Sequence, residues 1–415
     1  MVQAETASPE RKAELLEIAR ICRRVPAKPA QSFWEGLQGC WLMSIAAMIE
    51  CCGAGVSLGR CDQYLYPLYR HDLDRGVLSR NEAKDLMSML LIKMNDVTML
   101  QAGFLQVGFS GYPVMQGLTI GGVDQDGKDA VNELSYLILD AEEEVGLTSE
   151  ELVIRVSGQN PQTYLERACE VARNLSGKLK FVSDDSTIAA LVQFGLPERA
   201  ARDYISCGCH CPMVPAVNQI SAGVIFNYPL MLELALNNGV HRQTGLQLGP
   251  KTGDAAQFTC LKELEDAFEQ QFEALYRPAM AFKNADMFLY DTQMPCPLIS
   301  SFYGSCLERG DDFFHRGIDP YAGHVTGICG LPNIADSLAA IQQVVFQDRQ
   351  ATMGQLLQAL EANFEGYDQL LRQLKAAPKF GNDLDQVDLI ARRVLRRSSE
   401  YVCQQHTWNG RRCAI

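Results

Sequence analysis

Three thiols and one imidazole occupy five consecutive positions near the middle of the chain, at 207–211 (CGCHC). A thiol held on a stiff loop can lose a proton and attack as a nucleophile, or lose a hydrogen atom and carry a radical. His210 is the one neighbour that could favour a thiolate, and Pro212 and Pro215 stiffen the exit of the loop. This loop is therefore the first candidate for chemistry.

Two other interpretations of the loop compete with this one. Cysteine and histidine suit zinc or an iron–sulfur cluster, but consecutive C-x-C ligands crowd one centre, and no second C-x-x-C pair occurs elsewhere in the sequence. We therefore expect no metal site. The three cysteines could also be buried structural thiols in a turn, which is the usual role of any single buried cysteine.

The segments on either side of the loop predict helices that hold it in place. Residues 195–202 indicate a short helix opened by Pro197, and residues 220–237 indicate a longer, mostly apolar helix. Because irregular segments on a rigid scaffold often carry function, this arrangement favours a site at the loop.

Helix signals recur along the whole chain. A Ser-Pro pair at 8–9 predicts a helix start, and the segments 79–82 (SRNE) and 148–151 (TSEE) predict capping boxes. Apolar residues at spacings of three and four predict long helices over 261–275 and 356–374. These apolar stripes are the faces that helices bury in a core.

Four short segments predict strands, at 115–120, 152–156, 179–183 and 297–302. Because they alternate with helices, the predicted architecture is α/β, with a largely covered sheet or barrel. No low-complexity linker and no internal repeat divides the chain, so we expect one large domain over residues 1–415.

Composition excludes several classes of function. The formal net charge is −13, and an acidic surface repels the phosphate backbone of nucleic acids. No apolar run reaches the roughly 18 residues that a membrane span needs, and the segment 40–52 predicts a buried helix instead. The first residues lack the pattern of a secretory signal, and the 15 cysteines follow no disulfide framework, so we expect a cytoplasmic protein.

Several segments, taken in order, resemble the pyruvate formate-lyase superfamily of glycyl radical enzymes. The segment 57–67 (SLGRCDQYLYP) is similar to the family's G-R-x-D-Q-Y-L-Y-P stretch, and 118–124 (LTIGGVD) is similar to its G-G-x-D segment. Weaker matches lie at 33–41, 181–185, 248–254, 336–341 and 378–383. The order of these segments makes the resemblance specific, and it covers nearly the whole chain.

The resemblance implies an incomplete ten-stranded α/β barrel, rich in helix, with the cysteine loop as a finger inside it. It implies that Cys209 carries the thiyl radical. In dehydratase and decarboxylase branches the loop reads Gly-Cys-x-Glu-Pro, whereas 208–212 reads GCHCP here, so Cys211 replaces the glutamate. Cys211 could therefore act as a second thiol or as a weaker acid–base group, and His210 could take over the proton transfer. We expect all three residues to be catalytic.

The family's radical resides on a backbone glycine, installed by an activating enzyme that uses S-adenosylmethionine and an iron–sulfur cluster. This chain shows no Arg-Val-x-Gly-Tyr motif at its end and begins at what resembles a mid-domain helix. The resemblance thus implies a barrel domain truncated at both ends, without the glycine radical domain and with no directly bound cofactor. Three explanations compete: a gene fragment, a subunit completed by a separate glycine-bearing chain, and a degenerate homologue. The first needs no special assumption.

The expected function is a radical lyase or dehydratase, or an enzyme like formate C-acetyltransferase, acting on a small polar metabolite. The alternative is an inactive or metal-binding homologue. Arg60, Asp62 and His324 are candidate substrate-binding residues. A buried arginine suits a substrate carboxylate, although a structural ion pair in the barrel wall is the favoured explanation of Arg60 and Asp62, and His324 lies between two glycines, at 323 and 327. Asp184 and Asp185 could contact the cysteine loop, but a turn at the end of a strand explains them as well. Expected partners are the substrate, the activating enzyme and a second copy in a homodimer.

Overall fold

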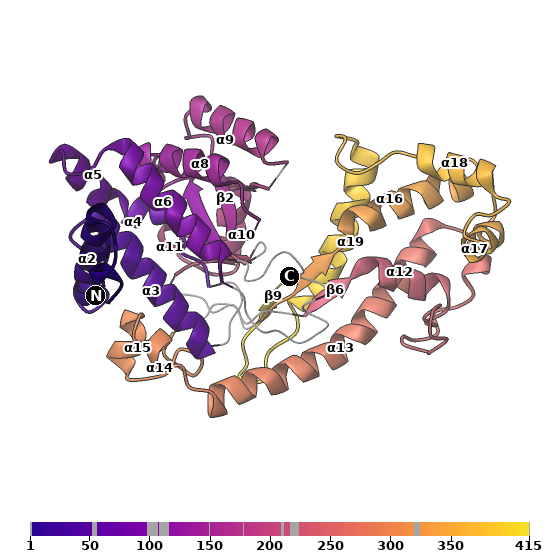
Figure 1. The fold of residues 1–415 in the computed structure, drawn as a ribbon. Coiled ribbons are helices and arrows are strands. Elements are labelled where there is room, and N and C mark those ends of the chain that lie inside the picture. The colour runs from indigo at the N-terminus through magenta and orange to yellow at the C-terminus, as the bar shows by residue number, and fades with distance from the viewer. Residues whose placement is uncertain are drawn as a thin grey trace. The chain divides into compact units, whose positions relative to one another are not determined.

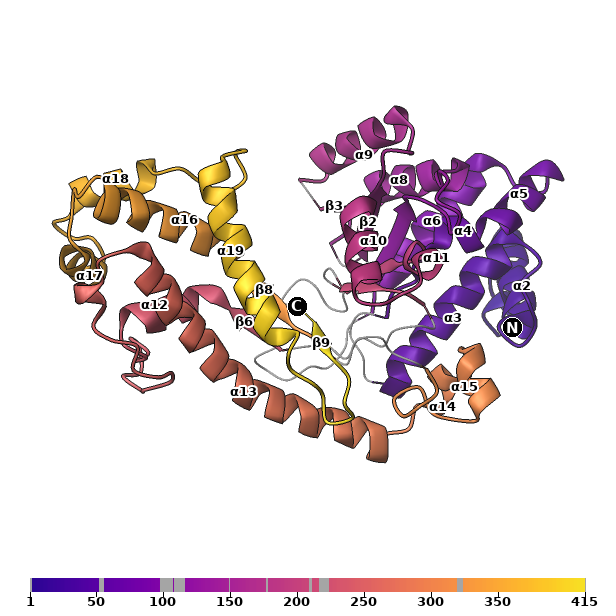
Figure 2. The same ribbon diagram turned by 180° about the vertical axis from the view of Figure 1, so that it is seen from behind.

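The computed structural model describes residues 2–51, 56–97, 107, 116–148, 150–176, 178–208, 211–215, 224–318 and 324–414. The chain divides into two compact units. Unit 1 comprises Met1–Gln219 and Pro295–Tyr321, and unit 2 comprises Ile220–Met294 and Ala322–Ile415. Helices dominate both units, and short strands lie among them (Figure 1; Figure 2 gives the opposite view).

Unit 1 is built on a three-stranded parallel sheet in the order β1 (Gln116–Gly121), β2 (Glu150–Val156) and β3 (Lys180–Ser183). Helix α8 (Glu133–Val145) connects the first pair of strands, and α9 (Gln162–Asn174) connects the second pair (Figure 1). Every residue of β1 is buried, as expected for a parallel strand covered on both faces. The three predicted strands in this part of the chain are confirmed.

The described part of unit 1 contains ten further helices, of which α4, α6 and α10 contact the sheet. They are α1 (Val2–Glu5), α2 (Pro9–Arg24), α3 (Phe33–Cys51), α4 (Cys61–Tyr64), α5 (Tyr66–Asp74), α6 (Arg80–Asn95), α10 (Asp184–Gln193), α11 (Glu198–Ala201), α14 (Pro297–Ser300) and α15 (Gly304–Arg309). The predicted starts of α2 and α6 are confirmed: Ser8 caps α2, and Ser79 forms a capping box with Glu82. Apolar side chains of α3, α6, α8, α9 and the sheet form the core.

Unit 2 consists mainly of helices that enclose a second core. Its elements are β6 (Ile225–Asn227), α12 (Tyr228–Leu236), η1 (Ala255–Gln257), α13 (Leu261–Gln293), β7 (His324–Val325), β8 (Gly327–Cys329), α16 (Leu331–Ile341), η2 (Gln342–Gln347), α17 (Met353–Glu361), α18 (Asp368–Ala376), α19 (Asp385–Val402) and β9 (Cys413–Ala414). Strand β6 pairs in parallel with β8, and β7 pairs in parallel with β9.

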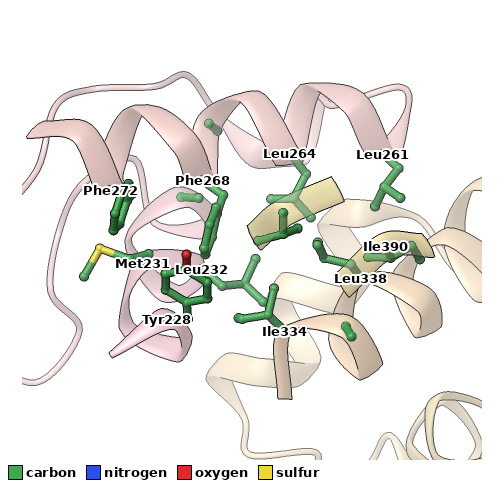
Figure 3. Packing of buried hydrophobic residues seen from close by; sticks show 14 of the residues in the cluster. Tyr228, Met231, Leu232, Leu261, Leu264, Phe268, Phe272, Ile334, Leu338 and Ile390 are labelled. Carbon is green, nitrogen blue, oxygen red and sulfur yellow. The ribbon is translucent and has the colours of Figure 1, made fainter. Parts of the chain in front are cut away.

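The predicted apolar stripe of α13 forms one side of the unit 2 core. Figure 3 shows Leu264 and Phe268 pointing toward side chains of α12, α16 and α19. Tyr228 packs edge-on against Phe268 and Phe272, with ring centroids 5.2 and 5.8 Å apart. Edge-to-face aromatic pairs of this kind add about 0.5–1.5 kcal/mol each beyond the burial of apolar area.

Two of the sequence predictions are wrong in unit 1. Residues 297–302 contain a short helix, α14, instead of a strand, because the Glu50 carboxylate accepts the N–H groups of Leu298 (2.8 Å) and Ile299 (2.7 Å) and so caps the helix from a distant part of the chain. The segment 148–151 starts no helix. Glu151 lies in β2, where parallel pairing with β1 outweighs the local capping signal.

Two long helices predicted for unit 2 are shorter than expected. Within 220–237, residues 220–223 lie outside the described residues and Ile225–Asn227 is strand β6, so the helix α12 begins only at Tyr228, with Pro229 in its first turn. The stripe over 356–374 belongs to two helices, α17 and α18. The break falls where Asn363 and Phe364 adopt φ of 47° and 63°, which an α-helix cannot accommodate.

Candidate functional site

The cysteine loop forms a β-hairpin in unit 1. Its strands are β4 (Ile205–Cys207) and β5 (Cys211–Met213), which pair antiparallel so that Cys207 lies opposite Cys211. After β4, Gly208 has a φ of 56°, which suits glycine, and Cys209 and His210 lie outside the described residues. The helix predicted before the loop is confirmed as α11, with Pro197 at its N-cap.

Hydrogen bonds from backbone N–H groups of the hairpin to two side-chain hydroxyls hold it beside β1. The N–H of Ser206 donates to Thr119 Oγ1 (3.2 Å), and the N–H of Gly208 donates to Ser57 Oγ (3.4 Å). The same Ser57 oxygen accepts from the N–H of Gly117 (3.1 Å). A Cβ on Gly117 would lie 3.1 Å from the carbonyl oxygen of Ser206, so a side chain at this position would push the hairpin away from the sheet.

A buried arginine fixes the base of the hairpin. The guanidinium of Arg155, on β2, donates to the carbonyl oxygens of Tyr204 (3.1 Å) and Arg202 (2.9 Å), just before β4. It is paired with Asp184, the first residue of α10 directly after β3, and lies 4.1 Å from the centre of the Tyr204 ring. The Tyr204 hydroxyl donates to Asp184 Oδ1 (2.8 Å). The carboxyl ends of two strands and the start of the hairpin therefore share one buried network.

Arg60 and Asp62, two predicted substrate-binding residues, lie beside this network. Arg60 donates to the carbonyl of Gly121 (3.1 Å) and pairs with Asp203 (3.2 Å). Asp62 Oδ2 accepts from the N–H of Gly121 (2.9 Å) and from Ser135 Oγ (2.7 Å), while burial raises the pKa of its carboxyl. Both side chains thus bind the protein's own groups, and their contact with a substrate stays a prediction.

His324, the third predicted substrate-binding residue, belongs to unit 2. It lies in β7, where its backbone pairs with Cys413 of β9, and its side chain is outside the described residues. Among the described residues, no three His, Cys, Asp or Glu side chains are placed to hold a metal ion. Since Cys209 and His210 are not among them, the metal-binding alternative for the loop is not tested. In the same part of the chain, no helix is both long and apolar enough to cross a membrane.

Sequence reasoning missed two residues of the site and anticipated a third. The expected contact of Asp184 with the loop is present, through Tyr204, but the part played by Arg155 was not predicted. The signal was an arginine inside an otherwise apolar strand end, 152–156 (LVIRV), where a charge requires a buried partner. Tyr303, between α14 and α15, was also missed: burial raises the pKa of its phenol, and the nearby Cys207 thiol adds to the rise.

The sequence matches the family described as pyruvate formate lyase-like over residues 1–414. The chain belongs to this family. It is 32% identical to trans-4-hydroxy-L-proline dehydratase of Clostridioides difficile over 397 residues, covering 95% of this chain and 50% of that protein. It is also 32% identical to isethionate sulfite-lyase of Nitratidesulfovibrio vulgaris over 410 residues, covering 96% of this chain and 49% of the relative.

Solved structures agree with this assignment. The glycerol-bound B12-independent glycerol dehydratase of Clostridium butyricum superposes with a TM-score of 0.87 at 32% identity, covering 99% of this chain and 52% of that one. A glycyl radical enzyme of Archaeoglobus fulgidus gives 0.86 at 32% identity, covering 99% and 53%. The helix-rich α/β fold is thus that of the family, and the chain spans about half the length of the relatives it matches.

Proposed function

We propose that this chain is the thiol-bearing part of a glycyl radical lyase or dehydratase that acts on a small polar metabolite. Its scaffold would be part of a ten-stranded α/β barrel, with the β4–β5 hairpin as the finger inside. The observation that carries the proposal is the anchored hairpin at the GCHCP segment in a chain of this family. By its position in the segment, Cys209 is the hydrogen-atom carrier.

The anchoring of the hairpin supports the proposed chemistry. A reactive sulfur has to be oriented toward the substrate C–H bond and kept away from water, and a misplacement of about 1 Å can cost on the order of 100-fold in rate. The network of Arg155, Asp184 and Tyr204 fixes the backbone before β4, and Thr119 and Ser57 fix the strand itself. A glycyl radical, when bound in its family position, would supply the hydrogen abstraction that activates Cys209.

Proton transfer is assigned to the residues after Cys209. A dehydratase must protonate its leaving hydroxyl, and the resembling branches use a glutamate at the position of Cys211. A cysteine thiol is ordinarily protonated near neutral pH and can donate, while the imidazole of His210 exchanges protons in that range. Arg60, Asp62 and His324 are the proposed substrate-binding residues.

The proposed enzyme needs two parts that this sequence does not supply, a glycine-bearing segment and an activating enzyme. Because the chain spans about half the length of its relatives, a glycine-bearing segment has to complete it, on the same polypeptide or on a partner. An activating enzyme of the radical S-adenosylmethionine type would install the radical, and the completed enzyme would be a homodimer.

The test is anaerobic reconstitution with the glycine-bearing segment found next to this reading frame and with its activating enzyme. Candidate substrates are those named for the relatives, trans-4-hydroxy-L-proline, isethionate and glycerol, together with other small polyols. Spin spectroscopy measures the glycyl radical, and chromatography measures the product. Cys209→Ala should keep the spin signal and lose turnover, whereas Cys207→Ala, a thiol two positions away, should keep both.

Two results would overturn the proposal. One is turnover by Cys209→Ala equal to that of the unchanged protein. The other is near-stoichiometric zinc or iron in anaerobically purified protein that disappears on substitution of Cys207, Cys209 or Cys211, which would favour the metal-binding alternative.

A further inference from the structure

Cys207 and Cys211 face each other across the hairpin. They are direct partners in the antiparallel register of β4 and β5, with three residues between them along the chain. Directly opposed residues on antiparallel strands have Cα atoms about 4.5–5.5 Å apart and side chains on the same face of the pair. Disulfides in proteins join Cα atoms about 4.4–6.8 Å apart. The register therefore gives the pair a Cα spacing within the disulfide range.

Both residues are thiols in this structure, and neither is fully buried. We propose that Cys207 and Cys211 are a reversible disulfide site that closes the base of the hairpin tip around Cys209. The oxidant is a low-molecular-weight disulfide, such as glutathione disulfide. One thiolate attacks a sulfur of that molecule and releases the first small thiol, and the other cysteine then attacks the mixed disulfide and releases the second. The S–S bond of the reagent is broken, the Cys207–Cys211 bond is formed, and the two protons leave on the two small thiols.

This disulfide is expected to be easily reduced. It closes a loop of very few residues, so it removes little conformational freedom from the unfolded chain and gains little stability from that source. Disulfides that gain little from the fold have less negative reduction potentials, and they respond to changes in the thiol pool. The pair is therefore suited to sensing oxidation around the hairpin tip.

The bond itself does not depend on the proposed function, but its consequence for activity does. Oxidation would take away the Cys211 thiol that is proposed to donate a proton, and it would leave Cys209 reduced between the two bridged positions. Exposure to mild oxidant would then stop turnover in a way that a dithiol reverses, since a disulfide, unlike a sulfinic or sulfonic acid, is reducible by thiols.

A labelling experiment tests the bond without any turnover. The whole chain is equilibrated anaerobically in glutathione buffers of increasing oxidised fraction, quenched with acid, and alkylated with iodoacetamide under denaturing conditions. Trypsin releases the peptide 203–242, which contains Cys207, Cys209 and Cys211 and no other cysteine. Fragment mass spectra then report the label at each position.

We expect the label on Cys207 and on Cys211 to fall together, about tenfold for each tenfold rise in the ratio of glutathione disulfide to the square of the glutathione concentration once the disulfide form predominates, while the label on Cys209 persists. Reduction with dithiothreitol should restore both. Cys209→Ser, the matched control, should still form the bond, and Cys207→Ser and Cys211→Ser should each abolish it. A bond that joins Cys209 to either neighbour in preference, or full labelling of all three positions at every oxidised fraction, would overturn the proposal. Full turnover by Cys209→Ala together with a normal disulfide would overturn the proposed function and leave the disulfide proposal standing.

Discussion

Arg155 and Asp184 form a bidentate ion pair in the interior of unit 1. Arg155 Nε lies 2.8 Å from Asp184 Oδ1, and Nη2 lies 2.9 Å from Oδ2, with the side chains 0% and 1% exposed. The same guanidinium donates to the carbonyls of Tyr204 and Arg202. The pair therefore joins the carboxyl ends of β2 and β3 to the chain that enters the hairpin, so its removal should affect both stability and hairpin position.

Replacing Arg155 should be strongly destabilising. Arg155→Met leaves the Asp184 carboxylate buried without its cation, and breaking a buried pair in this way costs about 3–5 kcal/mol. Urea unfolding followed by circular dichroism measures the loss, and faster alkylation of Cys207 and Cys211 measures the loosening of the hairpin.

The control for this variant is Arg199→Ala, which removes the ion pair between Arg199 and Asp126. These two side chains are 65% and 58% exposed. Exposed pairs contribute about 0–1 kcal/mol, so stability and alkylation rates should hardly change. Equal losses in the two variants would show that the buried pair has no special part in holding the hairpin.

The hydroxyl of Tyr204 should make a smaller, separable contribution. Tyr204→Phe removes the 2.8 Å hydrogen bond to Asp184 and keeps the ring beneath Arg155. Hydrogen bonds to charged groups contribute about 1.5–3 kcal/mol, and since Asp184 retains Arg155, we expect the lower end of that range. Tyr276→Phe is a matched control, because its hydroxyl lies 3.3 Å from the neutral Thr326 hydroxyl and should cost only about 0.5–1.5 kcal/mol. A larger urea-midpoint shift for Tyr276→Phe would contradict this assignment.

The glycine after β1 leaves space for the same network. Gly122 has φ of 70°, and a Cβ there would lie 2.6 Å from Arg155 Nε and 2.6 Å from Asp184 Oδ2. Gly122→Ala combines left-handed backbone strain with overpacking and should cost more than about 2 kcal/mol. Gly158→Ala, whose Cβ would have no atom within 4 Å, should change stability by less than about 1 kcal/mol. Thermal unfolding midpoints of the two variants measure this difference in stability, and similar midpoints would contradict the prediction.

Much of the unit 1 sheet could be predicted from sequence because its signals are local. Strands β1, β2 and β3 are short apolar runs between helices, and their predicted bounds agree with the structure to within two residues at each described end. The prediction for 297–302 was wrong because the Glu50 carboxylate that caps α14 is 248 positions away from Leu298 along the chain. No window of sequence contains that contact.

In the candidate site, too, the local motif could be predicted and its long-range contacts could not. The loop at 207–211 could be identified because three cysteines and a histidine in five residues are unusual in themselves. Its support could not be identified, because Arg155 is separated from Asp184 by 29 positions and from Tyr204 by 49. Residue types reveal where chemistry can occur, whereas the partners that hold a reactive segment depend on the folded topology.

A buried carboxyl in unit 2 should make stability depend on pH. Burial raises the pKa of Glu269, on α13, to about 7, although Arg397 Nε lies 3.7 Å from its Oε2 and opposes the rise. The folded state therefore holds this proton more tightly than the unfolded chain, so the stabilising contribution is complete below about pH 4.5 and is lost as the pH rises through about 7. The unfolding free energy should fall by roughly 2–3 kcal/mol between pH 5 and pH 8 from this group.

Glu269→Gln keeps the shape of the side chain and removes its titration, so it should flatten this part of the pH profile and stabilise the protein at pH 8 relative to the unchanged chain. Urea midpoints measured at intervals from pH 5 to pH 8 provide the comparison. Glu263→Gln, on the same helix, is the control: the Thr259 N–H lowers the pKa of that carboxyl, so it stays ionised across the whole window in both states and should leave the slope unchanged. If Glu269→Gln retains the slope of the unchanged protein, the buried carboxyl is not its source, and the pH dependence has to come from another group.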